Sequence, residues 1–209
     1  MMSASPDSGT IRKDALFLLK PQAPNLVLIG MPGVGKSTLG VLVAKQLAAP
    51  FVDTDLLIQA AHGKRLQEII LEKGLSGFRA IEQATVCSLG VTGTVIATGG
   101  SVVYSSEAME HLKAHGFILW LDLSLPFLEQ RLGDLDARGV LRAPGQTLEA
   151  LYQERKPLYA HHAQAHLLLD GLSHDEAVDA ILHTLKTHGF FFAEKKTHEC
   201  RHVFEGAAS

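Results

Sequence analysis

Short apolar runs alternate with longer segments of mixed polarity along most of the chain. Each run is a few residues long, apolar and bounded by turn residues, as expected of strands that are buried on both faces. We predict strands at 26–29, 51–52, 94–97, 117–121 and 167–169.

The longer segments between these runs predict helices. The stretch 56–89 holds two or three helical pieces, broken at Gly63 and Gly74. The other predicted helices cover 36–48, 106–115, 126–132, 147–162 and 174–187. Strands that alternate with helices indicate a parallel sheet with helices on both faces, and hence one α/β domain.

Three other segments complete the expected organisation. Residues 1–24 look like an N-terminal extension, because Pro21 and Pro24 stop any helix there. The stretch 133–146 is polar and contains Gly and Pro, which predicts a loop. Residues 189–209 form a tail after the domain at 25–188.

A glycine-rich turn follows the first predicted strand. Residues 30–37, Gly-Met-Pro-Gly-Val-Gly-Lys-Ser, match the pattern G-x-x-x-x-G-K-[ST]. Glycines let the backbone curl so that N–H groups point at phosphate oxygens, and the following helix aims its positive end at the same anion. A chance Gly-rich turn is the alternative, but a strand enters this loop and a helix leaves it.

The residues of this loop have distinct expected roles toward ATP and Mg²⁺. Lys36 reaches the β- and γ-phosphates, the Ser37 hydroxyl binds Mg²⁺, and Thr38 contacts the α-phosphate. The backbone cradle is completed by Gly33, Val34 and Gly35. The chain has no Asn-Lys-x-Asp motif and is short for a motor or transporter ATPase, which favours a small-molecule kinase.

Two carboxylates lie where the second predicted strand ends. Asp53 is placed to orient Mg²⁺ or its waters, and Asp55 can accept a hydrogen bond, and then a proton, from a substrate hydroxyl. Ligands bind at this edge of open α/β sheets. The alternative is that these residues only cap the next helix.

Two further patterns indicate a binding site for an anion. Arg79 and Glu82 share a helix face, so the Glu82 carboxylate can orient the Arg79 guanidinium to bind an anionic group. The alternative is a surface ion pair between the two residues that contributes little to stability. Gly99 and Gly100 follow the third strand and permit close approach of a ligand to the backbone, although an ordinary turn would use them too.

In this order, these motifs resemble those of the shikimate kinase family. The phosphate-binding loop, Asp-Thr-Asp, Phe-Arg-x-x-Glu, the Gly pair, an Arg-containing loop and Glu-Arg-x-Pro-Leu-Tyr cover about residues 26–185. The first motif is common to many NTPases, whereas the combination is specific to this family and its near relatives. We therefore expect a three-layer α/β/α P-loop NTPase fold, with strand order 2-3-1-4-5 and a mobile lid at about 133–146.

The resemblance also implies roles for individual residues. Asp55 would bind the shikimate hydroxyls, and Arg79 and Arg155 its carboxylate. Arg138 in the lid would reach over the transferring phosphate, and Arg131 would stack on adenine. Backbone N–H groups that contact the substrate would come from Gly99 and Gly100. Catalysis would rest on Lys36, Asp55 and Arg138.

Three positions depart from the family pattern. Ser101 stands in place of a third glycine, Gly139 in place of a lid proline, and Leu75 in place of a glutamate. Ser101 adds a hydroxyl beside the substrate pocket, and Gly139 makes the lid more flexible. Arg142 is a second lid cation, which either substitutes for Arg138, contacts ATP or is a solvated loop charge.

Composition narrows the range of partners. The chain has 209 residues, is 46% hydrophobic and carries a formal net charge of -3, so nothing predicts long-range attraction to nucleic acid or membrane. Cys87 and Cys200 suggest no disulfide framework, which favours a reducing, cytoplasmic setting. A monomer is expected for this class.

The leading functional hypothesis is ATP-dependent phosphorylation of the 3-hydroxyl of shikimate, a step of aromatic amino acid biosynthesis. The first alternative is a related kinase that acts on another small hydroxylated acid, motivated by Ser101 and Gly139. The second is a nucleotide-binding regulator without transfer activity.

Overall fold

Five parallel strands form the central sheet, in the spatial order β2-β3-β1-β4-β5. The computed structural model describes residues 23–132, 140–143 and 145–190. Most of the predicted N-terminal extension and C-terminal tail therefore lies outside the described residues, as do Arg138 and Gly139. The strands are β1 (Asn25–Ile29), β2 (Phe51–Asp53), β3 (Val95–Ala97), β4 (Gly116–Asp122) and β5 (Ala165–Leu168).

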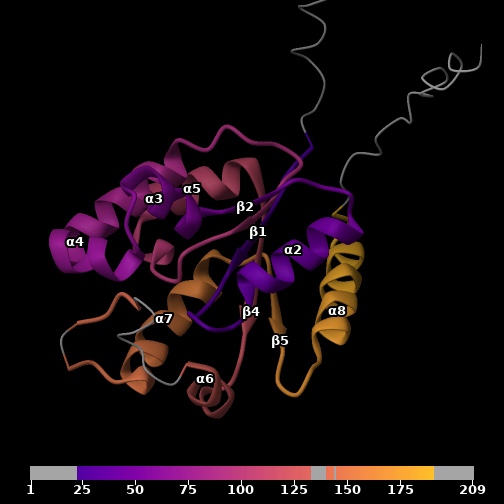
Figure 1. Cartoon of the computed structure of the whole chain (residues 1–209). Coiled ribbons are helices and arrows are strands. Elements are labelled where there is room, and N and C mark those ends of the chain that lie inside the picture. The colour runs from indigo at the N-terminus through magenta and orange to yellow at the C-terminus, as the bar shows by residue number, and fades with distance from the viewer. Residues whose placement is uncertain (1–22, 133–139, 144, 191–209) are drawn as a thin grey trace, which may run out of the picture.

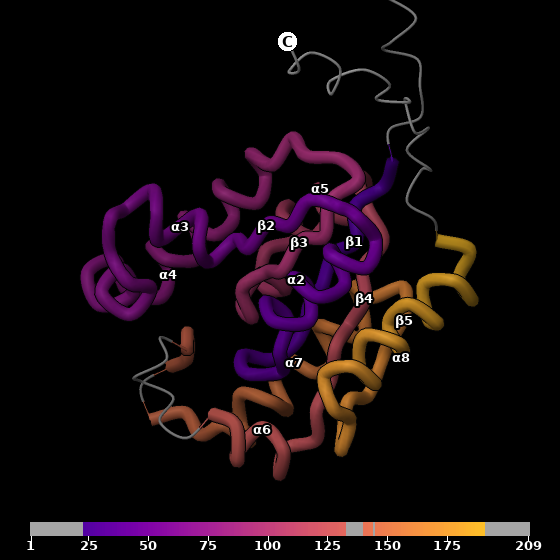
Figure 2. The backbone as a smooth tube through the Cα atoms, turned by 45° about the vertical axis from the view of Figure 1, so that its right-hand side comes forward, coloured from indigo at the N-terminus to yellow at the C-terminus, as the bar shows by residue number. Residues whose placement is uncertain are grey.

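Helices cover both faces of this sheet (Figure 1). Those on one face are α2 (Lys36–Gln46) and α8 (His174–Thr187), which contact each other as well as the strands (Figure 2). The others include α5 (Ser106–His115) and α7 (Leu148–His162), which contact β4. The three-layer architecture, the parallel sheet and its strand order confirm the predicted fold.

The remaining elements connect the strands. They are α3 (Thr54–His62), α4 (Leu66–Cys87), the short 3-10 helix η1 (Val102–Tyr104) and α6 (Leu125–Leu132). Gly63 ends α3 in a left-handed conformation, and α4 is interrupted at Gly74, where φ is 67° and ψ is 179°. Both predicted breaks are therefore confirmed.

The core forms because the strands carry almost only apolar side chains. Leu26, Val27, Leu28 and Ile29 of β1 are fully buried between the helical layers. Burial of one such side chain contributes about 1.5–3 kcal/mol relative to its exposed state. A second, smaller cluster beside the carboxyl ends of the strands consists of Ile58, Ile69, Phe78 and Leu141.

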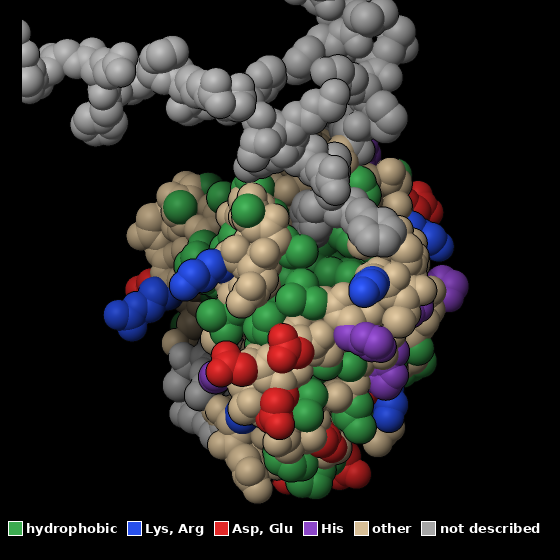
Figure 3. Space-filling view, turned by 90° about the vertical axis from the view of Figure 1, so that its right-hand side faces the viewer, with side chains coloured by type: hydrophobic (Ala, Val, Ile, Leu, Met, Phe, Trp, Pro, Cys, Tyr) green, Lys and Arg blue, Asp and Glu red, His purple; other side chains and the backbone are tan. Residues whose placement is uncertain are grey.

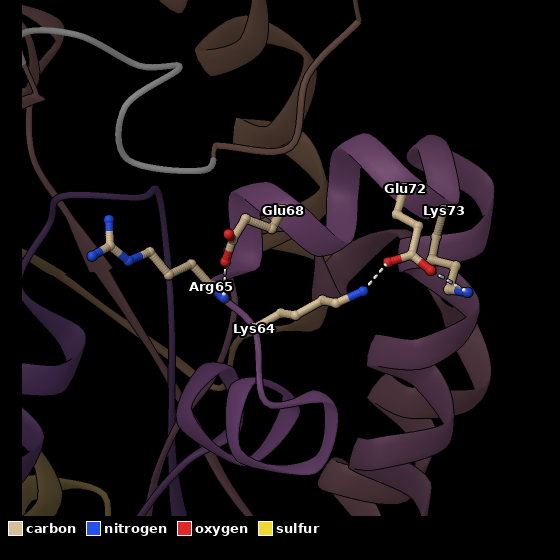
Figure 4. Close-up of polar contacts among 5 residues, drawn as sticks. All are labelled: Lys64, Arg65, Glu68, Glu72 and Lys73. Carbon is tan, nitrogen blue, oxygen red and sulfur yellow. Dashed lines mark hydrogen bonds and ion pairs between the residues drawn. The ribbon is translucent and has the colours of Figure 1, made fainter.

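Polar contacts close the connection between α3 and α4 at the surface (Figure 4). Lys64 Nζ lies 2.6 Å from Glu72 Oε2, and Lys73 Nζ lies 3.0 Å from Glu72 Oε1. The Arg65 N–H donates to Glu68 Oε2 at 2.7 Å, which satisfies one free donor at the start of α4. The Arg65 guanidinium itself points away from both glutamates.

On the side of the molecule where α8 lies, the surface carries side chains of several types. Figure 3 shows acidic, histidine and apolar side chains close together on that face. Among the helices of the described residues, none is long and apolar enough to span a bilayer. At the opposite edge of the sheet from the glycine-rich loop, Phe190 packs on Phe117 at the start of β4, with ring centroids 5.4 Å apart.

Candidate active site

The loop between β1 and α2 has a conformation that favours glycine at three positions. Gly30, Gly33 and Gly35 have φ values of 142°, 79° and 108°. A side chain at Gly30 would overlap the carbonyl oxygen of Leu121, and one at Gly33 would come within 2.6 Å of the Leu132 side chain. The curled backbone leads directly into α2, as the phosphate-binding motif predicts.

Lys36 is buried at the centre of this loop. Its Nζ donates to the carbonyl oxygens of Gly30 at 2.7 Å and Met31 at 2.9 Å. Burial lowers the pKa of Lys36 to about 8, although the nearby Asp55 carboxylate opposes this shift. The cation is therefore only partly compensated, and an anion in the site would stabilise it.

A cavity of about 460 Å³ opens beside the loop. Its phosphate end is lined by Pro32, Gly33, Gly35, Lys36, Ser37 and Thr38. Its opposite end is lined by Asp55, Thr98, Gly99, Gly100, Ser101 and Arg155. The apolar walls are Leu66, Phe78, Leu132, Val140 and Leu141. A volume of this size suits a small-molecule substrate.

Asp53 and Asp55 take different positions at the end of β2. Asp53 Oδ1 caps α3 by accepting from the N–H groups of Asp55 at 2.9 Å and Leu56 at 3.3 Å. The capping alternative for Asp53 is therefore seen in the structure, whereas Asp55 lines the cavity. Asp55 Oδ1 is buried and has no hydrogen-bond partner among the described residues.

The environment of Asp55 makes it a stronger base than an ordinary aspartate. Burial raises the pKa of Asp55 to about 6, the negative charge of Asp53 raises it further, and Lys36 opposes the shift. At neutral pH the carboxylate is still mostly ionised, so it can accept a hydrogen bond and a proton.

Arg155 reaches the same cavity from α7 and is only 1% exposed. Its Nε lies 3.2 Å from the Tyr104 hydroxyl, and its Nη2 donates to the carbonyl oxygen of Leu141. Arg155 Nη1 is buried and has no partner within the described part of the chain. One N–H edge of the guanidinium is therefore left for a ligand.

Arg79 lies at the rim and is exposed, outside the set of residues that line the cavity. Its guanidinium carbon is 4.1 Å from the centroid of the Tyr104 ring, and that of Arg155 is 5.2 Å from the same centroid. The two arginines that the sequence singled out thus meet at one ring, although they come from α4 and α7.

The predicted pairing of Arg79 with Glu82 is wrong. Glu82 is buried and accepts a hydrogen bond from Ser101 Oγ at 2.7 Å, so its carboxylate is held below the cavity floor and away from Arg79. Their spacing along the helix allows Arg79 and Glu82 to meet, but the Glu82 carboxylate is instead hydrogen-bonded by the Ser101 hydroxyl. Burial raises the pKa of Glu82 to about 7, against the opposing effect of the Ser101 hydrogen bond.

The Gly99–Gly100 turn packs closely on its neighbours. A side chain at Gly99 would overlap Glu82 Oε1 and lie 2.8 Å from Asp55 Oδ1, and one at Gly100 would meet Pro32 at 2.8 Å. The Gly99 N–H donates to Thr54 Oγ1 at 3.1 Å. Of the two amides that were expected to contact substrate, only that of Gly100 has no such partner among the described residues.

The other predicted nucleotide-binding residues surround the loop. Ser37 and Thr38 are exposed at the cavity. Arg131 Nη1 donates to the carbonyl oxygen of Val34 at 3.3 Å, which places this guanidinium beside the loop. Arg138 lies outside the described residues. Among the described residues there is no cluster of three or more His, Cys, Asp or Glu side chains arranged to hold a metal ion.

Several contributors to the site were not predicted from the sequence, among them Tyr104 and Leu141. Tyr104 falls in an apolar stretch with no motif to mark it. Leu141 lies in the predicted loop, where the apolar pair Val140-Leu141 is the one available signal; Leu141 is 4% exposed and packs with the α3–α4 cluster.

A phosphate-binding loop, a basic lysine and a separate acid–base end in one cavity define a P-loop kinase of small molecules. A family model described as shikimate kinase matches residues 32–186. The chain is 35% identical over 189 residues to a shikimate kinase of Microcystis aeruginosa, covering 89% of this chain and 94% of that protein. It is 44% identical over 144 residues to one of Nostoc sp., covering 66% of this chain and 78% of that protein.

Solved structures agree with these matches. A shikimate kinase from Acinetobacter baumannii in complex with shikimate superposes with a TM-score of 0.74 and 28% identity, over 79% of this chain and 94% of that chain. One from Aquifex aeolicus gives a TM-score of 0.69 and 29% identity, over 79% and 98%. The chain belongs to the shikimate kinase family of ATP-dependent phosphotransferases.

Proposed function

We propose that this protein transfers the γ-phosphoryl group of ATP to the 3-hydroxyl of shikimate, forming shikimate 3-phosphate and ADP. Membership of the shikimate kinase family supports this reaction, and one structural observation indicates where in the protein it takes place. Asp55 Oδ1 and Arg155 Nη1 are both buried without a partner among the described residues, and both residues line the cavity beside the phosphate-binding loop. A ligand with hydroxyl and carboxylate groups would satisfy both atoms.

Asp55 acts on the acceptor hydroxyl in this proposal. The hydroxyl oxygen forms a bond to the γ-phosphorus, and the bond from that phosphorus to the β–γ bridging oxygen breaks. The hydroxyl proton moves to Asp55, whose pKa of about 6 leaves it ionised at neutral pH but more basic than an ordinary aspartate.

Lys36 and the loop amides would hold the phosphates. Phosphoryl transfer is catalysed mainly by positioning and by stabilising charge that develops on phosphate oxygens. The Lys36 cation, now bound to two carbonyl oxygens, lines the cavity and would exchange them for phosphate oxygens. The buried setting strengthens its attraction for the anion.

The residues beside Lys36 fit a magnesium ion. Ser37 supplies an exposed hydroxyl at the cavity, and Asp53 uses one carboxylate oxygen for the helix cap, so the other oxygen remains for the ion or its waters. These are the oxygen donors that Mg²⁺ prefers. When bound, Mg²⁺ would neutralise negative charge on the nucleotide phosphates.

Arg155 and Arg79 would bind the acceptor carboxylate. Arg155 offers Nη1 inside the cavity, and the Arg79 guanidinium lies over the same Tyr104 ring as that of Arg155. Arginine suits this role because its planar donors match carboxylate geometry and its charge does not titrate in the physiological range. Arg131 would stack on the adenine of ATP, and Arg138 would reach over the transferring phosphate.

The direct test is ADP release by the full-length protein with ATP, Mg²⁺ and shikimate, coupled to a spectroscopic readout. We expect shikimate-dependent turnover, with phosphate on the 3-hydroxyl by NMR of the product. A folded protein, verified by circular dichroism, that releases no more ADP with shikimate than without it would contradict the proposal.

A panel of other small hydroxylated acids tests the runner-up. Ser101 was the main reason to consider a different acceptor, but its hydroxyl donates to Glu82 at 2.7 Å and is therefore already engaged. We expect kcat/KM for shikimate to exceed that for every other acid in the panel.

A further inference from the structure

Tyr104 has no part in the mechanism above, although the two arginines assigned to the acceptor carboxylate both lie close to its ring. It ends η1, three residues after Ser101, and its side chain is half-buried. The guanidinium carbons of Arg79 and Arg155 lie 4.1 Å and 5.2 Å from its ring centroid. These distances place both cations within the range in which an aromatic ring attracts a cation.

The Tyr104 hydroxyl adds a second set of contacts. It donates to Glu154 Oε1 at 2.6 Å and accepts from Arg155 Nε at 3.2 Å. Together with the Leu141 carbonyl at Nη2, these contacts fix the Arg155 guanidinium on two of its three nitrogens. They leave the unpartnered Nη1 directed to the cavity.

Arg79 depends on the ring because its expected carboxylate is engaged elsewhere. Ser101 Oγ holds Glu82, and the structure shows no ion pair between Glu82 and Arg79, both of which it describes. Two guanidinium groups that share a site repel each other, and the Glu154 carboxylate, which attracts both, offsets part of that repulsion. The ring face carries negative electrostatic potential, so it offsets that repulsion without occupying the donors.

We propose that Tyr104 is a positioning residue for the acceptor, whose ring and hydroxyl hold the Arg79 and Arg155 guanidiniums in the arrangement that receives the acceptor carboxylate. This inference rests on the proposed shikimate kinase activity. Tyr104 itself need not touch the acceptor, since it acts through the two arginines. The consequence is a selective effect on acceptor binding, while the nucleotide end of the cavity is unchanged.

Two substitutions separate the ring from the hydroxyl. Tyr104→Leu removes both, and we expect KM for shikimate to rise about three- to tenfold, with kcat and KM for ATP within about twofold of wild type. Tyr104→Phe keeps the ring under both cations but loses the hydroxyl contacts to Arg155 and Glu154. Its KM for shikimate should rise by about threefold or less, so partial rescue by Phe is the signature of the ring.

A double-mutant cycle tests whether Tyr104 acts through Arg79. In an Arg79→Ala background, Tyr104→Leu should raise KM for shikimate by a smaller factor than in wild type, because one of the two held cations is already gone. Tyr152→Leu is the matched control. Tyr152 also has a cation at its ring, Lys156 Nζ at 5.3 Å, but Lys156 has no role in the proposed acceptor site. It should lower stability and leave KM for shikimate unchanged.

The outcomes distinguish this inference from the proposed function. Wild-type turnover of shikimate, with a Tyr104→Leu variant whose KM for shikimate is unchanged or rises in step with KM for ATP, overturns the positioning role alone. Equal effects of Tyr104→Leu with and without Arg79 overturn its action through that arginine. A wild-type protein that does not turn over shikimate overturns both proposals.

Discussion

At the residue scale, two buried carboxylates at the proposed acceptor end of the cavity have strongly shifted pKa values. Asp55 and Glu82 both have raised pKa values, of about 6 and about 7, and burial is the largest cause for each. Their oxygens approach each other across Gly99, where a side chain would meet both. The raised values make Asp55 a suitable proton acceptor and make Glu82 costly to ionise.

Glu82→Gln should therefore stabilise the protein at alkaline pH. Between about pH 4.5 and 7, folded Glu82 keeps a proton that the unfolded chain has released, so wild-type stability falls as pH rises through this window. Glutamine cannot ionise and avoids this loss. We expect a gain on the order of 1–3 kcal/mol at pH 8 that disappears below about pH 4.5. Urea unfolding at several pH values measures it.

The control for this series is Glu129→Gln, which removes an exposed glutamate of α6. It should change stability by less than about 0.5 kcal/mol at either pH. A stability difference between Glu82→Gln and wild type that stays constant from pH 4 to pH 8 would show that burial does not penalise the Glu82 charge.

At the scale of elements, Leu141, which lines the cavity, packs against helices α3 and α4. Leu141 packs with Ile58, Ile69 and Phe78, and its carbonyl accepts from Arg155 Nη2. This one residue therefore joins α3, α4 and α7 at the cavity. The exposed ion pairs of Lys64 and Lys73 with Glu72 in the same part of the chain add little, because solvent screens them.

Leu141→Ala should loosen this junction. We expect a loss of about 2 kcal/mol in the free energy of unfolding, because a buried leucine leaves a cavity that the cluster fills only in part. Leu71→Ala is the control, since Leu71 of α4 is 79% exposed, and it should cost less than about 0.5 kcal/mol. Equal losses of unfolding free energy in the two variants, measured by denaturant unfolding, would mean that the packing of Leu141 against α3 and α4 contributes little to stability.

Element boundaries also show where sequence patterns suffice. The strand β1, which is apolar apart from Asn25, and the loop after it were predicted within one residue, because a buried strand and a glycine-rich turn are local signals. For β5 the prediction began two residues late. His166 is half-exposed and breaks the apolar run, and only its pairing with Trp120 of β4 makes it part of a strand.

At the scale of the whole molecule, the sequence predicted which residues converge better than how they contact one another. Asp55 and Arg155 lie a hundred positions apart and line one cavity, as the shared motifs implied. The partners of Arg79 could not be predicted, because they depend on Ser101 and Tyr104, which reach the site through the turn after β3. Such contacts depend on tertiary packing, which spacing along one helix does not report.

The central claim is that Arg155 and Asp55 form an acceptor site separate from the nucleotide site within one cavity. Initial-rate kinetics of Arg155→Ala, with shikimate and ATP each varied, test it most directly. We expect KM for shikimate to rise at least about tenfold, while KM for ATP stays within about twofold, in a protein whose thermal unfolding confirms that it is folded. Equal increases in both KM values, or no change in either, would contradict it.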